Sequence, residues 1–361
     1  MIITVTMNPA IDRTVQLTEL VPGQMHRFGT AQSDVGGKGI NVSKMLRTLG
    51  TPSVACGILA GRAGDRIEKQ LADWEIESKF VRAEGETRTN EKLIEQSGRM
   101  TELNEAGPEV TLAQLEEVKA TIRQILTAAG DACSIVAISG SVPRGVPKNF
   151  YRELVEEIHD CGGTAILDAD GELFREGVKA KPDYVKPNAE ELRSYFAARG
   201  ENPDDAVEGN PAQNADSATG DETANQKANV PEDSTAKYAS LIRMGRKLQS
   251  EGIPNVIISM GGEGALFLRE ESANGANDES AATPVLYCPA LPVKAISTVG
   301  AGDSVVAALC YGFENNLSWE DTVRRCMAAS AGAVTTAGTR PPEPEVIEEL
   351  IGKVKIEPLV L

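Results

Sequence analysis

Between residues 134 and 199 the chain alternates three times between a short apolar run and a segment of helical length. The apolar runs are residues 134–139, 164–168 and 184–186, and the longer segments are 149–159, 172–180 and 190–199. Strands joined by helix-length connections run parallel, and a parallel sheet carries helices on both faces. We therefore predict an α/β fold with a central, mostly parallel sheet. Similar apolar runs predict further strands at 2–7, 53–57, 255–259, 265–269 and 285–288.

Helices outside this alternating region are predicted from apolar spacing and capping signals. Glycines at 36–39 open a helix that reaches residue 48, and Thr111 with Gln114 forms a capping-box pattern at the start of another. The remaining predicted helices are 66–74, 236–250, 302–311, 318–335 and one near 344–355. Four segments mix polar and apolar residues as strands with one solvated face do, and they predict a separate small sheet: 13–17, 24–33, 86–95 and 100–104.

The charge of the chain limits its partners. It carries 36 Lys and Arg against 53 Asp and Glu, a net charge of −17. A nucleic-acid surface needs excess Lys and Arg to displace counterions, so we expect no nucleic-acid partner, whereas a small phosphorylated substrate needs only a few local cations. Residues 201–236 hold nine acidic residues and one Lys. We predict that 200–235 is an acidic disordered insertion and 272–283 a second acidic loop.

Cysteine and histidine usage points to the cytoplasm and away from a metal centre. The six cysteines form no C-x-x-C pair, and most lie in apolar runs, which favours reduced core residues. With His26 and His159 as its only histidines, the chain cannot build a three-His metal site. We also predict no signal peptide and no membrane partner, since no apolar run of about 18 residues is present.

The strongest chemical signal is the segment Thr298-Val-Gly-Ala-Gly-Asp303, which leads into an apolar helix. Glycines let the backbone approach a ligand closely, and the free N–H groups at a helix start favour a negative charge. Asp303 could take a proton from an attacking hydroxyl there. The same residues could instead form a tight turn and a helix cap. The supporting motifs favour the functional interpretation.

Two further segments carry polar groups suited to a sugar. Gly36-Gly37-Lys38-Gly39-Ile40-Asn41 offers backbone amides, a cation and an amide side chain, although it could be only a helix-opening turn. Asp12 follows the first predicted strand, where open parallel sheets bind ligands, although a turn-forming Asp is the alternative. The sequence contains neither a G-x-x-x-x-G-K-[ST] motif nor a G-x-G-x-x-G between a strand and a helix.

Together these motifs resemble the PfkB family of carbohydrate kinases, which has the ribokinase fold. Within that family, residues 101–108, 140–145 and 167–171 are most similar to the 1-phosphofructokinases and their tagatose-6-phosphate kinase relatives. The resemblance implies one kinase domain over residues 1–361, with a β-sheet lid from about 11–33 and 86–104. It also implies ATP and Mg²⁺ as cofactors, a sugar-phosphate acceptor and a homodimer paired through the lid.

The resemblance also assigns roles by position. Asp303 would be the base, with the anion hole formed by the amides of Gly300, Ala301, Gly302 and Asp303. Asn188 and Glu191 match an N-x-x-E element that positions Mg²⁺ through water, although they could also be a helix cap. The ATP site would take Lys186, Asn188, Ser259, Gly261, Gly264, Thr298 and Gly302, with residues 328–338 closing over the adenine. Contacts to the acceptor sugar would come from Asp12, Gly37, Lys38, Asn41 and Ser141.

A phosphate on the acceptor needs cations of its own. Arg88 matches the arginine of phosphosugar members, and Arg27 and Arg144 are possible helpers, each with a surface position as the alternative. The expected reaction is ATP-dependent phosphorylation of a ketohexose phosphate, with fructose 1-phosphate first and tagatose 6-phosphate or fructose 6-phosphate as alternatives. Two remoter alternatives are a kinase of an unphosphorylated sugar or nucleoside and a non-catalytic sugar-phosphate-binding regulator.

Overall fold

The computed structural model describes residues 1–130, 134–201, 234–270 and 284–359. Its main feature is a ten-stranded sheet in which seven neighbouring strands are parallel and three antiparallel strands form one edge. The parallel strands are, in spatial order, β5 (Glu77–Ala83), β4 (Val54–Ala60), β1 (Ile2–Thr6), β8 (Ile135–Ser139), β9 (Thr164–Asp168), β10 (Tyr184–Val185) and β11 (Asn255–Ser259). The antiparallel edge is β12 (Ala265–Arg269), β13 (Val285–Cys288) and β14 (Glu357–Leu359).

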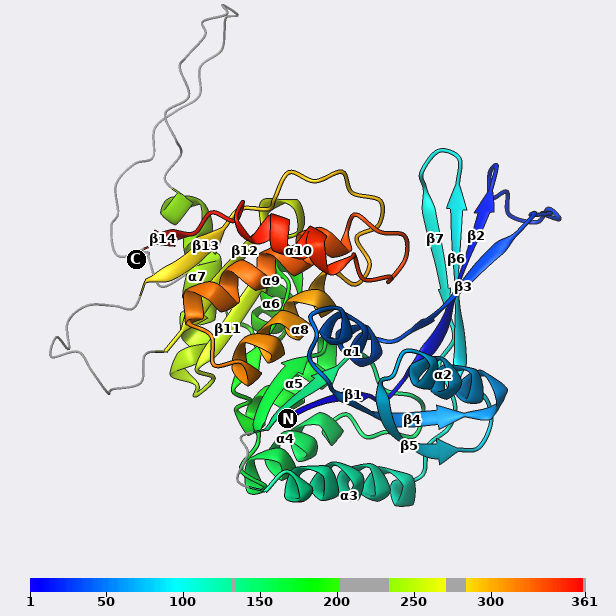
Figure 1. Ribbon diagram of the computed structural model, residues 1–361, viewed down its shortest axis with the longest axis horizontal. Coiled ribbons are helices and arrows are strands. Elements are labelled where there is room, and N and C mark those ends of the chain that lie inside the picture. The colour runs from blue at the N-terminus through cyan, green and yellow to red at the C-terminus, as the bar shows by residue number, and fades with distance from the viewer. Residues whose placement is uncertain (131–133, 202–233, 271–283, 360–361) are drawn as a thin grey trace, which may run out of the picture.

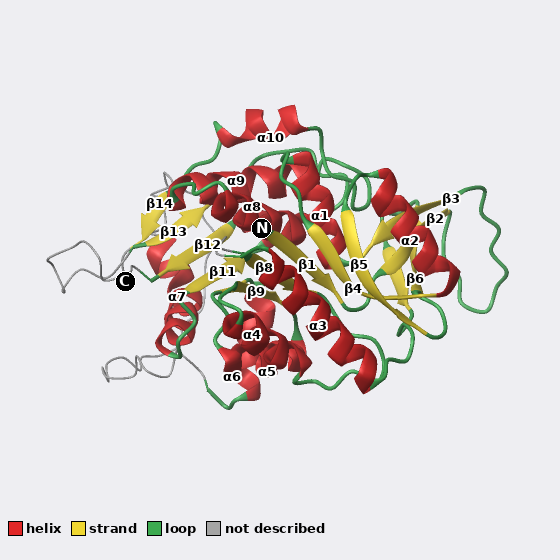
Figure 2. Cartoon of the chain, turned by 60° about the horizontal axis from the view of Figure 1, so that its bottom comes forward, coloured by secondary structure: helices red, strands yellow, loops and turns green. Residues whose placement is uncertain are grey.

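Helices cover both faces of this sheet (Figure 2). One face carries α3 (Leu112–Ala128), α4 (Phe150–Asp160), α5 (Gly171–Gly177), α6 (Ala189–Ala198) and α7 (Ser234–Ser250). The other face carries α1 (Lys38–Thr48), α8 (Ala301–Glu314), α9 (Trp319–Ala333) and α10 (Pro344–Ile351). A smaller apolar cluster holds α2 (Gly61–Asp73) against β4. Strands buried on both faces explain the near-continuous apolar runs in the sequence.

A second sheet stands apart from the main body (Figure 1). Its four strands lie in the order β3 (Ala31–Gly36), β2 (Ala10–Leu17), β6 (Arg88–Glu95) and β7 (Met100–Asn104). β2 and β6 are parallel, and the two outer pairs are antiparallel. We call this sheet the lid.

The α/β class and the parallel sheet are confirmed, while two predicted elements are misplaced and two strands were not predicted. The strand predicted at 24–33 is found at Ala31–Gly36, because this segment pairs with β2 rather than following its own weak pattern. β5 was not predicted, since its solvent-facing residues are charged, and neither was the short edge strand β14. Helix α2 begins at Gly61 rather than residue 66.

Some predictions lie outside the described residues. Residues 202–233 of the acidic insertion, the second acidic loop at 272–283 and Cys133 are among them. All five described cysteines are unpaired; four are buried, while Cys161 is half-exposed. Among the described helices, none has the length and apolarity needed to cross a membrane.

Candidate active site

A cavity of about 560 Å³ lies at the carboxyl ends of the parallel strands, beneath the lid. Its floor includes residues that end or directly follow neighbouring strands: Thr6, Ser139, Asp168, Lys186 and Ser259. Carboxyl ends of parallel strands are where open α/β sheets bind ligands. The lid contributes Asp12, Arg88, Asn90 and Lys92, and the start of α8 contributes Gly300, Gly302 and Asp303.

The start of α8 presents a buried carboxylate beside free backbone amides. Gly300 caps the helix in the left-handed conformation (φ 84°), which glycine adopts without strain. Asp303 is 6% exposed and accepts a hydrogen bond of 2.8 Å from Asn41 Nδ2 on α1. Burial, reinforced by the charge of Asp168, raises the pKa of Asp303 to about 6. A carboxylate with such a pKa is ionised at neutral pH and can accept a proton.

Asp168 is the second buried carboxylate of the floor, and its environment shifts its pKa in the direction opposite to that of Asp303. Its Oδ1 lies 3.3 Å from both Lys38 Nζ and Lys186 Nζ. Burial opposes its ionisation, but the two lysines outweigh this effect and hold the pKa of Asp168 below its usual value. Asp168 was not singled out from the sequence. Its position at the end of a buried strand, the argument applied to Asp12, could have identified it.

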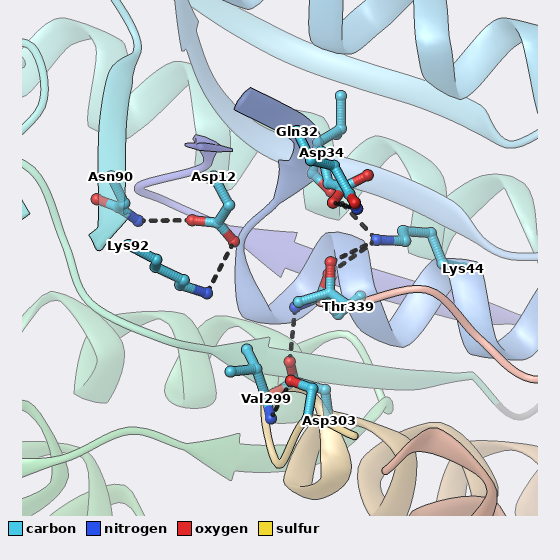
Figure 3. A network of polar contacts seen from close by, with 12 residues as sticks. Asp12, Gln32, Asp34, Lys44, Asn90, Lys92, Val299, Asp303 and Thr339 are labelled. Carbon is cyan, nitrogen blue, oxygen red and sulfur yellow. Dashed lines mark hydrogen bonds and ion pairs between the residues drawn. The ribbon is translucent and has the colours of Figure 1, made fainter. Parts of the chain in front are cut away.

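The lid holds one group of paired residues and one unpaired cation. Asp12 accepts a hydrogen bond of 2.9 Å from Asn90 and lies 3.7 Å from Lys92 Nζ, as Figure 3 shows. Arg88 donates to the carbonyls of Asn8 and Glu105 and forms no ion pair with any described residue. Burial lowers its pKa, opposed by the charge of Asp12. Its positive charge is therefore available to a ligand anion.

Five buried polar atoms along this cavity have no hydrogen-bond partner among the residues that the structure describes. They are Thr6 Oγ1, Asn8 Oδ1, Asn90 Oδ1, Ser139 Oγ and Asp168 Oδ2. Buried polar groups are normally paired, and a cluster of unpaired ones within one cavity suits a ligand rich in hydroxyl groups.

At the other end of the cavity, Asn188 and Glu191 cap the start of helix α6. This cap is the alternative that the sequence left open beside a role in positioning Mg²⁺. Each side chain accepts from the other's backbone N–H at 2.8 Å, and both still line the cavity. Ser259 lies beside Asn188 and is shared with an adjoining pocket of about 420 Å³ that includes Gly261. Thr298 and Gly264 line neither space; a Cβ on Gly264 would collide with the Cys288 carbonyl.

The remaining candidate residues divide by location. Gly37, Lys38, Asn41 and Ser141 line the cavity, and Ala301 lies at the helix start between two glycines that do. Arg27 and Arg144 are exposed and lie outside the cavity of this chain. Within the described residues, no three His, Cys, Asp or Glu side chains form a group that could hold a metal.

These features define a class of protein: an α/β protein in which a buried aspartate lies beside a helix start that favours anions. Two solved structures show the same fold, the tetrameric inhibited form of phosphofructokinase-2 from Escherichia coli (22% identity, TM-score 0.75, 98% of each chain) and ribokinase from Thermotoga maritima. The ribokinase match has 18% identity and a TM-score of 0.69, covering 97% of this chain and 99% of the other.

The family follows from sequence comparison. The model of the pfkB family of carbohydrate kinases matches residues 5–216 and 222–346, and the chain belongs to this family. A 1-phosphofructokinase from Haemophilus influenzae is 30% identical over 358 residues, which cover 98% of this chain and 97% of that protein. The chain is thus a carbohydrate kinase, a phosphotransferase that uses ATP.

Proposed function

We propose that this kinase transfers the γ-phosphoryl group of ATP to the C6 hydroxyl of fructose 1-phosphate, giving fructose 1,6-bisphosphate. The observation that carries the proposal is the placement of two groups in one cavity: Asp303 at the anion-favouring start of α8, and the unpaired Arg88 in the lid. A base beside an anion site fits phosphoryl transfer, and an unpaired arginine fits an acceptor that already carries a phosphate. The similarity to a 1-phosphofructokinase selects the acceptor.

In the proposed mechanism the acceptor lies between the lid and α8. Arg88 binds its phosphate, while Asp12, Lys38, Asn41 and the backbone at Gly37 hold its hydroxyls, helped by Ser141. Asp303 takes the proton of the C6 hydroxyl as O6 bonds to the γ-phosphorus and the bond to the β,γ-bridging oxygen breaks. The amides of Gly300, Ala301, Gly302 and Asp303 stabilise charge on the transferred group. Arg27 and Arg144 would act only if the lid or a partner subunit brings them closer.

On the donor side, we propose that five residues hold the ATP phosphates: Lys186, Asn188, Ser259, Gly261 and Gly302. Thr298 and Gly264 shape the adjoining turns. Mg²⁺ is part of the proposal. It binds nucleotides through one or two carboxylates together with phosphate oxygens and water. The unpartnered Oδ2 of Asp168 and the carboxylate of Glu191, of which Oε2 accepts the cap hydrogen bond, suit this role without a larger protein cluster. When bound, it neutralises charge on the phosphates.

We further propose one kinase domain whose lid pairs with the lid of a second copy. Four large apolar side chains are exposed on the lid strands and the connection between them: Met25, Phe28, Met100 and Leu103. Exposed apolar groups gathered in one part of a molecule mark a protein interface. A cytoplasmic location agrees with ATP as donor and with unpaired cysteines.

The test is ADP release from the purified chain with Mg·ATP and each of fructose 1-phosphate, fructose 6-phosphate and tagatose 6-phosphate. We expect the highest kcat/KM with fructose 1-phosphate. Fructose without phosphate is the control for the role of Arg88 and should react poorly. A higher kcat/KM with either 6-phosphate, or with free fructose, would overturn the proposed substrate.

A further inference from the structure

A second cavity, of about 640 Å³, lies away from the candidate active site. It is bounded by β3, α1, α2 and residues 340–344, which precede or begin α10, and we call it the α1–α2 pocket. None of the roles proposed above uses it. It shares no lining residue with the candidate active site, although Lys44 on its wall lies one helical turn from Asn41.

The α1–α2 pocket is positively charged in a strongly acidic protein. Among the described residues, its lining includes the cations Lys44, Arg47, Arg66 and Arg340 and the acidic residues Asp34 and Glu343. Arg47 also lies 3.5 Å from Glu75, which is outside the pocket. Arg66 donates to the Ser33 carbonyl at 3.3 Å and forms no ion pair within the described part of the chain. Arg340 is 3.4 Å from Asp34 and its side chain is 60% exposed. A concave surface of one sign concentrates ions of the opposite sign, so the expected ligand is an anion.

The remainder of the pocket indicates what else the ligand contains. Trp74, Pro341 and Pro342 provide an apolar wall, and Lys44 Nζ lies 5.5 Å from the centre of the Trp74 ring. Small-molecule sites combine such apolar walls with a few placed polar groups. The expected ligand is therefore a small organic molecule with two or more carboxylate or phosphate groups.

Lys44 connects this pocket to Asp303. It is buried and donates to the Val35 carbonyl of the lid strand β3 (3.1 Å), to Thr339 Oγ1 (2.9 Å) and to Asn41 Oδ1 (3.3 Å). Asn41 in turn donates to Asp303. Figure 3 shows Lys44 between Asp34 and Thr339. One side chain thus contacts the lid, the pocket and the partner of the candidate base.

We propose that the α1–α2 pocket is a regulatory site for a small multivalent organic anion, whose binding changes the turnover of the kinase through Lys44 and Asn41. An anion near Lys44 competes with its present partners, so the position of Asn41 and the lid strand would change. Binding at the pocket does not depend on the proposed function. The effect on turnover does rest on the proposed function, so binding and turnover are measured separately.

Binding is measured by Trp74 fluorescence, because the chain has two tryptophans and Trp319→Phe leaves Trp74 alone. Citrate and inorganic phosphate are titrated as separate probes, in the absence of Mg²⁺. We expect a saturable change with at least one probe, and a dissociation constant raised about tenfold or more in Arg66→Gln/Arg340→Gln. Calorimetric titration of the unmodified chain gives the same measurement should Trp319→Phe not fold.

Two controls make the binding test specific. Arg62→Gln changes another exposed arginine of α2 that does not line the pocket, and it should bind the probe normally. Arg88→Ala should keep the fluorescence change, since the probe is not bound at the lid. No saturable change by either method, or an equal change in Arg66→Gln/Arg340→Gln, overturns the site; loss of the signal in Arg88→Ala assigns it to the active site instead.

Turnover is then measured with and without the saturating probe at constant free Mg²⁺. We expect kcat to change by about fivefold, at the low end of typical couplings between sites, and the change to disappear in Arg66→Gln/Arg340→Gln. Binding with no change in kcat would overturn the regulatory role while leaving the site. Absence of any turnover with the three sugar phosphates would refute the proposed function without affecting the binding result.

Discussion

The floor of the candidate active site and its lid differ in how their charges are paired. On the floor, Asp168 is 1% exposed and is held by two lysines from different elements. On the lid, Arg88 contacts only backbone carbonyls, and its charge remains unpaired within the described residues. A charged side chain held by ion pairs keeps a fixed position, which suits a group that acts in the reaction or stabilises the fold. A charged side chain without an ion pair is able to bind a ligand of opposite charge. We therefore expect floor variants to change kcat or stability and lid variants to change KM.

The two buried carboxylates of the floor also differ from each other in their partners and in the direction of their pKa shifts. Asp303 has an amide partner and a raised pKa, while Asp168 has two cationic partners and a lowered pKa. Buried carboxylates whose environments shift their pKa values in opposite directions commonly have different roles. Asp303 is the one suited to accept a proton, and Asp168 is the one suited to fix the lysines.

The largest expected effect is that of Asp303→Asn. Loss of a general base lowers kcat by about a hundredfold or more, with little change in the KM of either substrate. Steady-state kinetics with ATP and fructose 1-phosphate measure both constants. Asp321→Asn is a matched control, because Asp321 also lies in the first turn of its helix but is outside the cavity. Near-normal turnover in Asp303→Asn would contradict the proposed role.

The next effect is on stability. Asp168→Asn leaves Lys186 buried without its ionic partner, and we expect the free energy of unfolding at pH 8 to fall by roughly 3 kcal/mol. Because the pKa of Asp168 is lowered on folding, its contribution is present above the unfolded pKa and is lost on acidification. Denaturant titration at pH 8 measures the change. Asp303→Asn is the control: it removes a charge that burial disfavours, so it should not destabilise the protein. Equal destabilisation by both variants would show that the ion pairs of Asp168 do not distinguish it from Asp303.

Arg88→Ala tests the lid. A charge-assisted hydrogen bond to phosphate is worth about 1.5–3 kcal/mol, so the KM for the sugar phosphate should rise about ten- to a hundredfold. The KM for ATP should remain nearly constant. Arg13→Ala removes a lid arginine that is paired with Glu91 outside the cavity, and it serves as the control. An unchanged acceptor KM in Arg88→Ala would place the acceptor phosphate elsewhere.

The smallest expected effect concerns pH. With a pKa of about 6, Asp303 becomes protonated as the pH falls through that value, and kcat/KM should fall with it. The hydrogen bond from Asn41 lowers this pKa, so Asn41→Leu should raise it and move the loss of kcat/KM to higher pH. The measurement is kcat/KM against pH, because this ratio reports the ionisation of the free enzyme. A midpoint that stays in place or moves to lower pH would show that Asn41 does not control the ionisation of Asp303.

Much of the fold was predictable because its signals are local. The apolar strands of the parallel sheet and the capping boxes at Thr111 and Asn188 are short patterns that the structure reproduces. The strand β5 was missed because its charged residues face solvent at the sheet edge, where a strand needs only one buried face. The position of β3 was wrong because pairing with β2, rather than its own sequence, determines where it lies.

The alternation of strands and helices from β8 to α6, the glycine-rich start of α8 and the carboxylate three residues into it can be recognised from the sequence alone. What that carboxylate contacts depends on how the chain folds. Asn41 and Asp303 are 262 positions apart, and Lys44 and Thr339 are 295 apart, so no local pattern reports these contacts. The pKa of a buried group depends on its burial and on nearby charges in space. For that reason the opposite states of Asp303 and Asp168, and the cationic α1–α2 pocket, became visible only in the folded chain.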